Sequence, residues 1–301
     1  MGIHPRPYQR YGRGTLPFLI DSYDDAKIAL TTIGYYRLKG YSFQLVDSTT
    51  QKFREGTCLS DILKLYQFDS ELRRLLFSYL SLIEVALRSH IVNSFQLTRE
   101  NPHDVLIWND PSEFKNKSMF WKNQGTIARE ICRSKDAFIQ HNFQKYDGAI
   151  PIWAVVEVVS FGTVSKIVKN MKTGNDTAFS ELRKSYKFRG RNGNYIYPSQ
   201  DMLTSWIYAA SILRNICAHN GRIYNRVFSI RPKLIEADAI SPVPQFYGLY
   251  QILLSMKYLR PTDDSWNIFC ADLLNLLNKY SDVCDLRRLN FPSDWESHII
   301  L

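Results

Sequence analysis

The spacing of apolar residues predicts helices along almost the whole chain. Apolar positions recur every three or four residues, which is the period of a helix that buries one face. A capped helix is expected from about residue 21, and the longest one at 71–95. Further helices are predicted at about 126–144, 151–160, 163–171, 199–220, 246–259 and 265–280. The pattern therefore predicts an all-α fold.

The helix predicted from residue 199 has the clearest signals. Ser199 is a typical N-cap, and an apolar stripe follows it at alternating spacings of three and four residues. The stripe consists of Leu203, Trp206, Ala210, Leu213 and Cys217. This face is expected to be buried.

Glycine, proline and polar clusters divide the chain without marking a linker. Residues 1–20 are expected to form an arm, followed by a single helical domain at 21–301 with core helices at about 60–95 and 151–280. Residues 33–43 fit either a helix or a short strand. Loops are predicted at 99–126 and 187–194. The aromatic residues expected in the core include Trp108, Phe114, Phe120, Trp121, Trp153 and Phe161.

The composition is that of a globular protein with a basic excess. Hydrophobic residues make up 45% of the 301 residues and charged residues 22%, and the formal net charge is +9. An excess of this sign suits a polyanionic partner such as nucleic acid, because binding releases counterions from the phosphates. Solubility alone also explains it, and both interpretations stay open.

Cysteine usage and the N-terminal segment favour a cytoplasmic protein. The five cysteines are odd in number and scattered, without a CxxC pair. We find no signal-peptide pattern and expect no apolar stretch long enough for a membrane span, which requires about 18 residues. The expectation is therefore no contact with a membrane. A metal site is not expected either, since Cys217 and His219 have no second pair of ligands.

The best candidate for chemistry is the C-terminal part of the 199–220 helix. If the helix continues, Asn215, His219, Arg222 and Arg226 share one polar ridge. If Gly221 ends it, the two arginines curl around the site instead.

Arg214 precedes His219 by five residues, or roughly 140° around an ideal helix. A compact pocket would therefore need another helix or a second subunit. A surface or capping pair of Arg and His, with no catalytic role, fits the same spacing.

Several segments carry a family resemblance. Arg214 to His219 resembles the R-x4-6-H motif of HEPN ribonucleases. Supporting segments occur in the right order at 33–41, 83–88, 151–153, 160–162, 219–226 and 291–295. Together they resemble the Abi-like (abortive-infection) HEPN proteins of bacteria over about residues 20–295.

The resemblance implies a HEPN-type helical bundle with an N-terminal helical extension, working as a homodimer in which two motif helices face each other. It implies phage defence of abortive-infection or toxin–antitoxin type, RNA as substrate, and an antitoxin or a regulatory small RNA as a further partner. The expected activity is that of an endoribonuclease without metal or cofactor. A non-catalytic RNA-binding or regulatory module is the alternative.

The resemblance also assigns roles to residues. His219 would move protons, since imidazoles exchange them near neutral pH. Arg214 would hold the charge that develops on the phosphorus, and Asn215 would orient the phosphate or the imidazole. Arg222 and Arg226 would hold flanking phosphates.

Two further groups of residues are weaker candidates. Glu84 and Arg88 form an i,i+4 pair that either stabilises its helix or enters the pocket, where Arg88 would contact RNA and Glu84 would support the site. Lys187, Arg189 and Arg191 either form a solvated loop or contact RNA.

Overall fold

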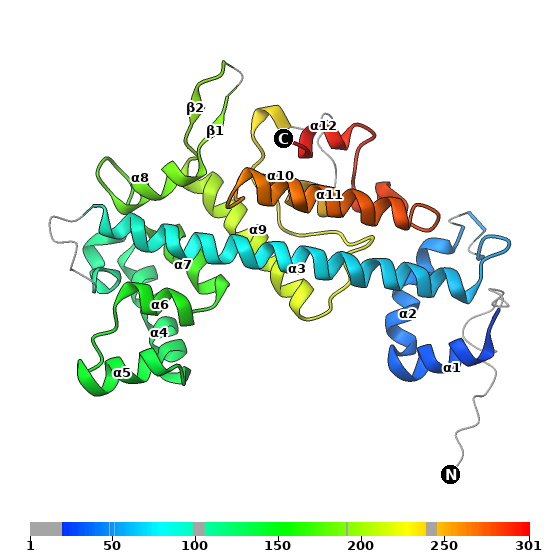
Figure 1. Cartoon of the computed structure of the whole chain (residues 1–301), viewed down its shortest axis with the longest axis horizontal. Coiled ribbons are helices and arrows are strands. Elements are labelled where there is room, and N and C mark those ends of the chain that lie inside the picture. Colours follow the sequence, from blue (N-terminus) through cyan, green and yellow to red (C-terminus); the bar gives the residue numbers. More distant parts are fainter. Residues whose placement is uncertain (1–19, 48, 51, 99–105, 191, 239–245) are drawn as a thin grey trace, which may run out of the picture. The chain divides into compact units, whose positions relative to one another are not determined.

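The structure is a computed structural model that describes residues 20–47, 49–50, 52–98, 106–190, 192–238 and 246–301 (Figure 1). The arm predicted for residues 1–20 thus lies outside the described residues, except for Ile20. Helix accounts for 65% of the described residues. The predicted all-α class is confirmed.

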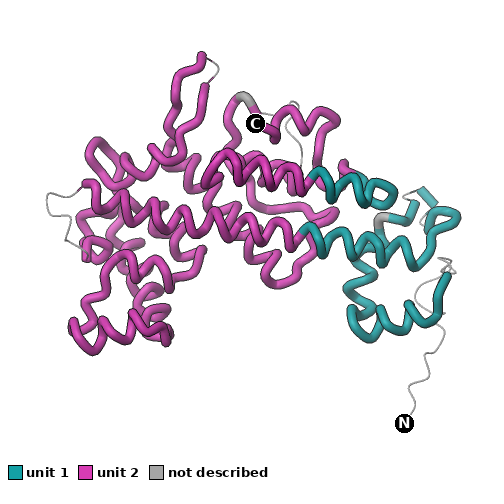
Figure 2. The backbone as a smooth tube through the Cα atoms, in the orientation of Figure 1, with its two compact units in different colours: residues 1–72, 274–285 teal, residues 73–273, 286–301 magenta. Residues whose placement is uncertain are grey.

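The chain packs into two compact units (Figure 2). Unit 1 comprises residues 1–72 and 274–285, and unit 2 comprises residues 73–273 and 286–301. The boundaries fall inside two helices, α3 (Leu59–Gln96) and α11 (Asp263–Lys279). The single domain expected over residues 21–301 stays a prediction.

Unit 1 begins with the capped helix that the sequence predicts. Its elements, besides parts of α3 and α11, are α1 (Tyr23–Thr32), α2 (Tyr35–Ser42) and η1 (Phe43–Leu45). Ser22 caps α1 by accepting a hydrogen bond from the Asp25 amide at 3.2 Å. The segment 33–43, for which helix and strand were both open, is helical. Its buried Tyr41 donates a hydrogen bond to Asp69 on α3 at 2.5 Å.

The long helix α3 spans 38 residues from Leu59, in agreement with the core helix predicted at about 60–95, and the run at 71–95 is its larger part. Among the described residues it is the one helix long and apolar enough to cross a membrane, with an 18-residue window of mean hydropathy 1.4. The expectation that no stretch reaches this length is therefore wrong. Within unit 2, α3 buries Leu76, Leu80, Ile83 and Leu87 on one face. A helix in the core of a protein can be as long and as apolar as a membrane-spanning helix.

Unit 2 holds most of the helices. After α3 come η2 (Ile107–Asn109), η3 (Pro111–Glu113), α4 (Lys117–Arg133), α5 (Ala137–Lys145), α6 (Ile152–Val158), α7 (Phe161–Asn170), α8 (Ala178–Leu182) and η4 (Arg183–Tyr186). A hairpin of β1 (Phe188–Arg189) and β2 (Tyr195–Ile196) replaces the predicted loop at 187–194. The remaining elements are α9 (Gln200–Ala218), η5 (Glu236–Asp238), α10 (Leu249–Lys257), η6 (Leu286–Leu289) and α12 (Trp295–Ile299).

Helix α9 is central to the packing of unit 2, where it contacts α7 and α10. Its predicted stripe from Leu203 to Cys217 is buried, as expected. Trp206 on this stripe is fully buried, stacks on Tyr258 with ring centroids 5.2 Å apart, and donates its indole N–H to the Lys233 carbonyl at 2.6 Å. The indole thus buries a large apolar area with its polar atom satisfied.

The predictions for residues 99–144 need correction. Asn116 caps α4 by accepting a hydrogen bond from the Met119 amide at 2.8 Å, so the helix starts at Lys117, inside the predicted loop. The helix predicted at 126–144 is two helices, because Ser134 and Asp136 bond to each other and break it.

Two tryptophans expected in the core are exposed instead. Trp121 is 62% exposed and Trp153 is 46% exposed. Each follows a buried residue, Phe120 or Ile152, and successive helical side chains point roughly 100° apart. Phe114, Phe120 and Phe161 are buried as predicted, and Trp108 is half-buried.

His90 on α3 lies against the buried Tyr186, whose hydroxyl is 3.1 Å from the His90 Nδ1. Burial lowers the pKa of His90, because the charged imidazole loses hydration there. Below its ordinary pKa of about 6.5, the unfolded chain therefore binds a proton more readily than the folded chain.

We therefore expect the free energy of unfolding to decrease as the pH falls from about 6.5, and His90→Gln to reduce that decrease. Urea unfolding at about pH 7.5, 6.5 and 5.5 measures this pH dependence, because these values bracket the ordinary pKa of an imidazole. His141→Gln, at an exposed position on α5, is the control and should leave the slope unchanged. Equal slopes in the wild type and His90→Gln would contradict the assignment.

Candidate functional site

The end of α9 fixes the position of the motif histidine. His219 is the C-cap, and Asn220 adopts a left-handed backbone with φ of 52°. The Asn220 amide bonds to the Cys217 carbonyl at 3.1 Å, and the Gly221 amide to the Ile216 carbonyl at 2.7 Å. These two bonds form a Schellman motif, which ends the helix. A Cβ on Gly221 would lie 2.9 Å from the Ile216 Cγ2, so the turn needs a glycine.

The continuous polar ridge from Asn215 to Arg226 is therefore not formed, and the alternative, in which the helix ends near Gly221, is observed. Arg222 and Arg226 lie in the irregular segment that follows. The Arg226 Nη1 donates to the Arg222 carbonyl at 3.3 Å, and its guanidinium lies over the Phe228 ring at 5.7 Å.

Arg214 is held from α3. Its Nη2 lies 3.1 Å from the Glu84 Oε2, and its guanidinium lies 5.9 Å from the centre of the Phe77 ring. Arg88 pairs with the other oxygen of the same carboxylate. The side chains of Glu84 and Arg88 are 8% and 10% exposed, and that of Arg214 is 31% exposed. The structure thus brings three of the predicted site residues together in one cluster.

This cluster carries one positive charge in excess, because two guanidiniums share one carboxylate. The Arg214 Nε and the Arg88 Nη1 are buried and have no hydrogen-bond partner among the described residues. The Arg214 Nη1 donates to the amide oxygen of Asn215 at 3.3 Å, which places Asn215 beside the cluster. Buried donors with excess positive charge favour an anionic ligand, since each unpaired donor costs free energy.

His219 belongs to a different face of α9. Spacings of four, three and four residues place one stripe of side chains on this face, made of Tyr208, Ile212, Asn215 and His219. Tyr208 is 52% exposed, Asn215 and His219 are exposed, and Ile212 is half-buried. Within the described part of the chain, no hydrogen bond or ion pair joins the imidazole to Arg214, so the two motif residues have separate environments.

The predicted cations of the 187–194 segment lie on the hairpin. Lys187 and Arg189 are exposed, and Arg191 lies outside the described residues. Sequence reasoning missed the exposed Tyr195 and Tyr197 beside them, because a strand of two residues leaves no clear alternation in the sequence.

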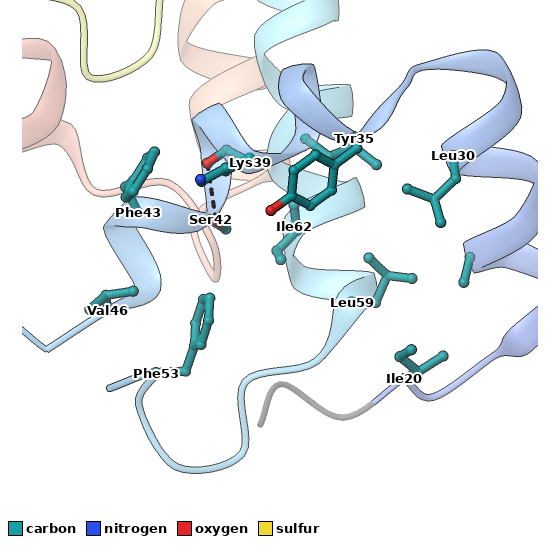
Figure 3. A pocket seen from close by; sticks show the side chains of 12 residues that line it. Ile20, Leu30, Tyr35, Lys39, Ser42, Phe43, Val46, Phe53, Leu59 and Ile62 are labelled. Carbon is teal, nitrogen blue, oxygen red and sulfur yellow. Dashed lines mark hydrogen bonds between the residues drawn. The ribbon is translucent and has the colours of Figure 1, made fainter. Parts of the chain in front are cut away.

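Unit 1 contains a hollow of another kind (Figure 3). It has a volume of about 250 Å³, and Tyr35 on α2 and Leu59 and Ile62 on α3 line it with apolar surface. Among the described residues that line it, Lys39 is the one that carries a charge. A single lysine among apolar walls offers no acid–base pair, so this hollow does not suit phosphodiester chemistry. Sequence reasoning did not identify it.

Fold and site together define a mostly helical protein with an R-x4-H motif at the end of α9, in which Arg214 joins the cluster with α3 and His219 is exposed. The family model described as Abi-like protein matches residues 28–225, roughly two thirds of the chain. The chain belongs to the Abi-like protein family, and membership implies a role related to abortive infection. No curated protein and no solved structure matches the chain.

Glu84→Gln tests the cluster. Removing the carboxylate charge leaves two guanidiniums uncompensated, and breaking a buried ion pair costs about 3–5 kcal/mol. Because the Arg214 side chain is 31% exposed, we expect a loss near the lower end, about 3 kcal/mol of unfolding free energy in urea titrations.

The matched control is Glu181→Gln, which removes a surface i,i+3 pair with Lys184. Exposed pairs of this kind contribute up to about 1 kcal/mol. A Glu84→Gln variant no less stable than this control would show that the carboxylate does not hold the cluster.

Proposed function

We propose that the protein is an antiphage abortive-infection endoribonuclease that cleaves RNA without a metal ion. The observation that carries the proposal is the cluster in which Glu84 and Arg88 on α3 hold Arg214 of the R-x4-H motif on α9. Its excess positive charge and two unpaired buried donors suit a phosphate group. The basic composition, with a net charge of +9, supports a polyanionic substrate.

The reaction is a transesterification within the RNA backbone. The ribose 2′-oxygen attacks the adjacent phosphorus and loses its proton, while the bond from phosphorus to the 5′-oxygen breaks and that oxygen gains a proton. The products are a 2′,3′-cyclic phosphate and a free 5′-hydroxyl. His219 transfers protons, because it is exposed and imidazoles exchange protons near neutral pH. Arg214 stabilises the charge on the phosphorane through paired N–H donors.

Asn215 orients the Arg214 guanidinium, in keeping with the hydrogen bond between them. Glu84 and Arg88 position Arg214 from α3. Arg222, Arg226, Lys187 and Arg189 hold flanking phosphates. The burial of Arg88 favours positioning over the direct RNA contact expected from the sequence.

The complete site consists of two copies of the chain. Arg214 and His219 lie on different sides of α9, so a second α9 facing the first would bring the histidine stripe of one copy toward the cluster of the other. The exposed Tyr208 and half-buried Ile212 beside His219 give this stripe an apolar component, which suits contact with protein.

The separation of the two motif residues also favours a second candidate, a non-catalytic RNA-binding or regulatory module. In both cases the proposed partners are RNA and a second copy of the chain, with an antitoxin or regulatory small RNA as the controlling partner. Cleavage distinguishes the two candidates.

We expect His219→Ala and Arg214→Ala each to reduce RNA cleavage by at least about 100-fold, the lower range for losing a group that acts in proton transfer. Purified protein is incubated with labelled RNA in EDTA, and the ends are mapped. Wild-type protein should leave cyclic-phosphate and 5′-hydroxyl ends.

The control is His141→Ala, an exposed histidine on α5, which should cleave like the wild type. Thermal unfolding checks that each variant folds. Cleavage retained by both site variants would refute the proposal, and RNA binding without cleavage by the wild type would favour the regulatory module.

The two-copy site predicts that a charge on the α9 stripe separates the copies. Tyr208→Glu should yield a monomer in size-exclusion chromatography with light scattering and should lose cleavage, because it buries a carboxylate at the contact. Ile268→Glu on α11, at a position 65% exposed, is the control and should stay dimeric and active. A wild-type monomer that cleaves RNA would exclude the two-copy site.

A further inference from the structure

The hairpin of unit 2 directs two kinds of side chain to its two faces. Arg189 pairs with Tyr195 and Phe188 with Ile196, and residues directly opposite in an antiparallel pair share a face. Phe188 is 9% exposed and packs against Trp206 and Tyr258, with ring centroids 6.2 and 5.2 Å away. One face therefore anchors the hairpin in the core beside α9.

The opposite face joins cations to exposed aromatic rings. The Lys187 Nζ lies 4.5 Å from the centre of the Tyr195 ring, and the Arg189 guanidinium lies 5.8 Å from it. Tyr195 is nevertheless 52% exposed. Tyr197, two residues further and 42% exposed, has the Arg183 guanidinium 5.7 Å from its ring. The Arg183 Nε is buried and has no hydrogen-bond partner among the described residues.

The hairpin concentrates the positive charge of the chain. Residues 183–197 contain five Lys or Arg and no Asp or Glu, against a net charge of +9 for all 301 residues. Figure 1 shows the hairpin projecting from the helices of unit 2. Gly193 in its turn has a φ of 75°, a backbone conformation that other residues rarely adopt. This surface is accessible, rigidly anchored and strongly basic.

We propose that this hairpin face binds single-stranded RNA, with bases stacked on Tyr195 and Tyr197 and phosphates held by Arg183, Lys187 and Arg189. The inference rests on the proposed function for RNA as the ligand and adds that the RNA is unpaired. Stacking on tyrosine requires a base whose π-face is free, and a duplex hides that face between neighbouring base pairs. An acidic protein would pair with the cations, but its carboxylates would not stack on the two exposed tyrosine rings.

The hairpin and the motif lie at opposite ends of α9. The 19 residues of this helix span about 27 Å at 1.5 Å per residue. An RNA that contacts both must therefore extend over several nucleotides. The hairpin selects a single-stranded stretch at a distance from the scissile bond, which gives preference for unpaired RNA without reading its sequence.

Fluorescence anisotropy with the full-length His219→Ala protein tests the hairpin without cleavage of the probe. The probes are a labelled, unstructured pyrimidine RNA and the same strand annealed to its complement. Tyr195→Leu should weaken binding of the single strand by about tenfold or more, since stacking on an aromatic side chain is lost. It should leave the slope of log affinity against log salt unchanged, because no cation is removed.

Two comparisons separate stacking from charge. Tyr195→Phe keeps the ring and should bind the single strand like the parent. Lys187→Gln combined with Arg189→Gln should reduce the salt slope by about 1.4, because each lost phosphate contact on a single strand lowers the slope by about 0.7. The matched control is Tyr36→Leu, at an 86% exposed tyrosine in unit 1, which should have no effect.

The inference is overturned if Tyr195→Leu binds the single strand as tightly as the parent. It is overturned equally if Tyr195→Leu weakens the binding of the duplex or of polyglutamate to the same extent. That result would identify a surface for polyanions or proteins in general. Failure of the proposed function is separate: if wild-type protein cleaves no RNA but the Tyr195 effect persists, the hairpin remains an RNA-binding element. Normal cleavage with no Tyr195 effect would remove only the hairpin.

Discussion

One buried carboxylate shared by two guanidiniums connects α3 to α9 in unit 2. Glu84 accepts from Arg88 on its own helix and from Arg214 on the other, and within the described residues neither guanidinium pairs with another carboxylate. Without it, two cations would face each other in a poorly hydrated site. The orientation of Arg214, which is one of the two residues of the motif, depends on the single charge of Glu84.

The other half of the motif depends on backbone geometry. Apolar contacts fix α9 along its buried stripe, but His219 lies beyond the last helical residue and is set by the Schellman bonds of Asn220 and Gly221. One short motif thus joins a side chain positioned by tertiary electrostatics to one positioned by a local turn. This division is the reason for proposing a site composed of two copies rather than a site within one chain.

Local and periodic features of the sequence predicted much of the fold. The Ser199 cap and the stripe through Trp206 identified α9 and its buried face, because helix period and capping act within a few residues. The exposure of Trp121 and Trp153 was missed, since it depends on which neighbouring helix covers each face. Glu84 was a candidate by its spacing to Arg88, but its pairing with Arg214 joins residues 130 positions apart, and no local pattern encodes that.

The hairpin shows a further limit of pattern reading. Gly190 and Gly193 suggested a loop, and strands of two residues are too short to produce a clear alternation. The basic residues were recognised as candidates from composition, whereas the tyrosines beside them became apparent only from the register of the pair. The HEPN-type bundle itself stays a prediction from resemblance.

The Schellman turn has a consequence for motion. Helix ends open locally at much lower free energy than helix interiors, and the last turn of α9 is closed by the backbone bonds of the His219, Asn220 and Gly221 amides. Fraying of this turn would carry His219 away while Arg214, tied to α3, stays in place. We therefore expect the two residues of the motif to differ in mobility as well as in position, with His219 the more mobile of the two.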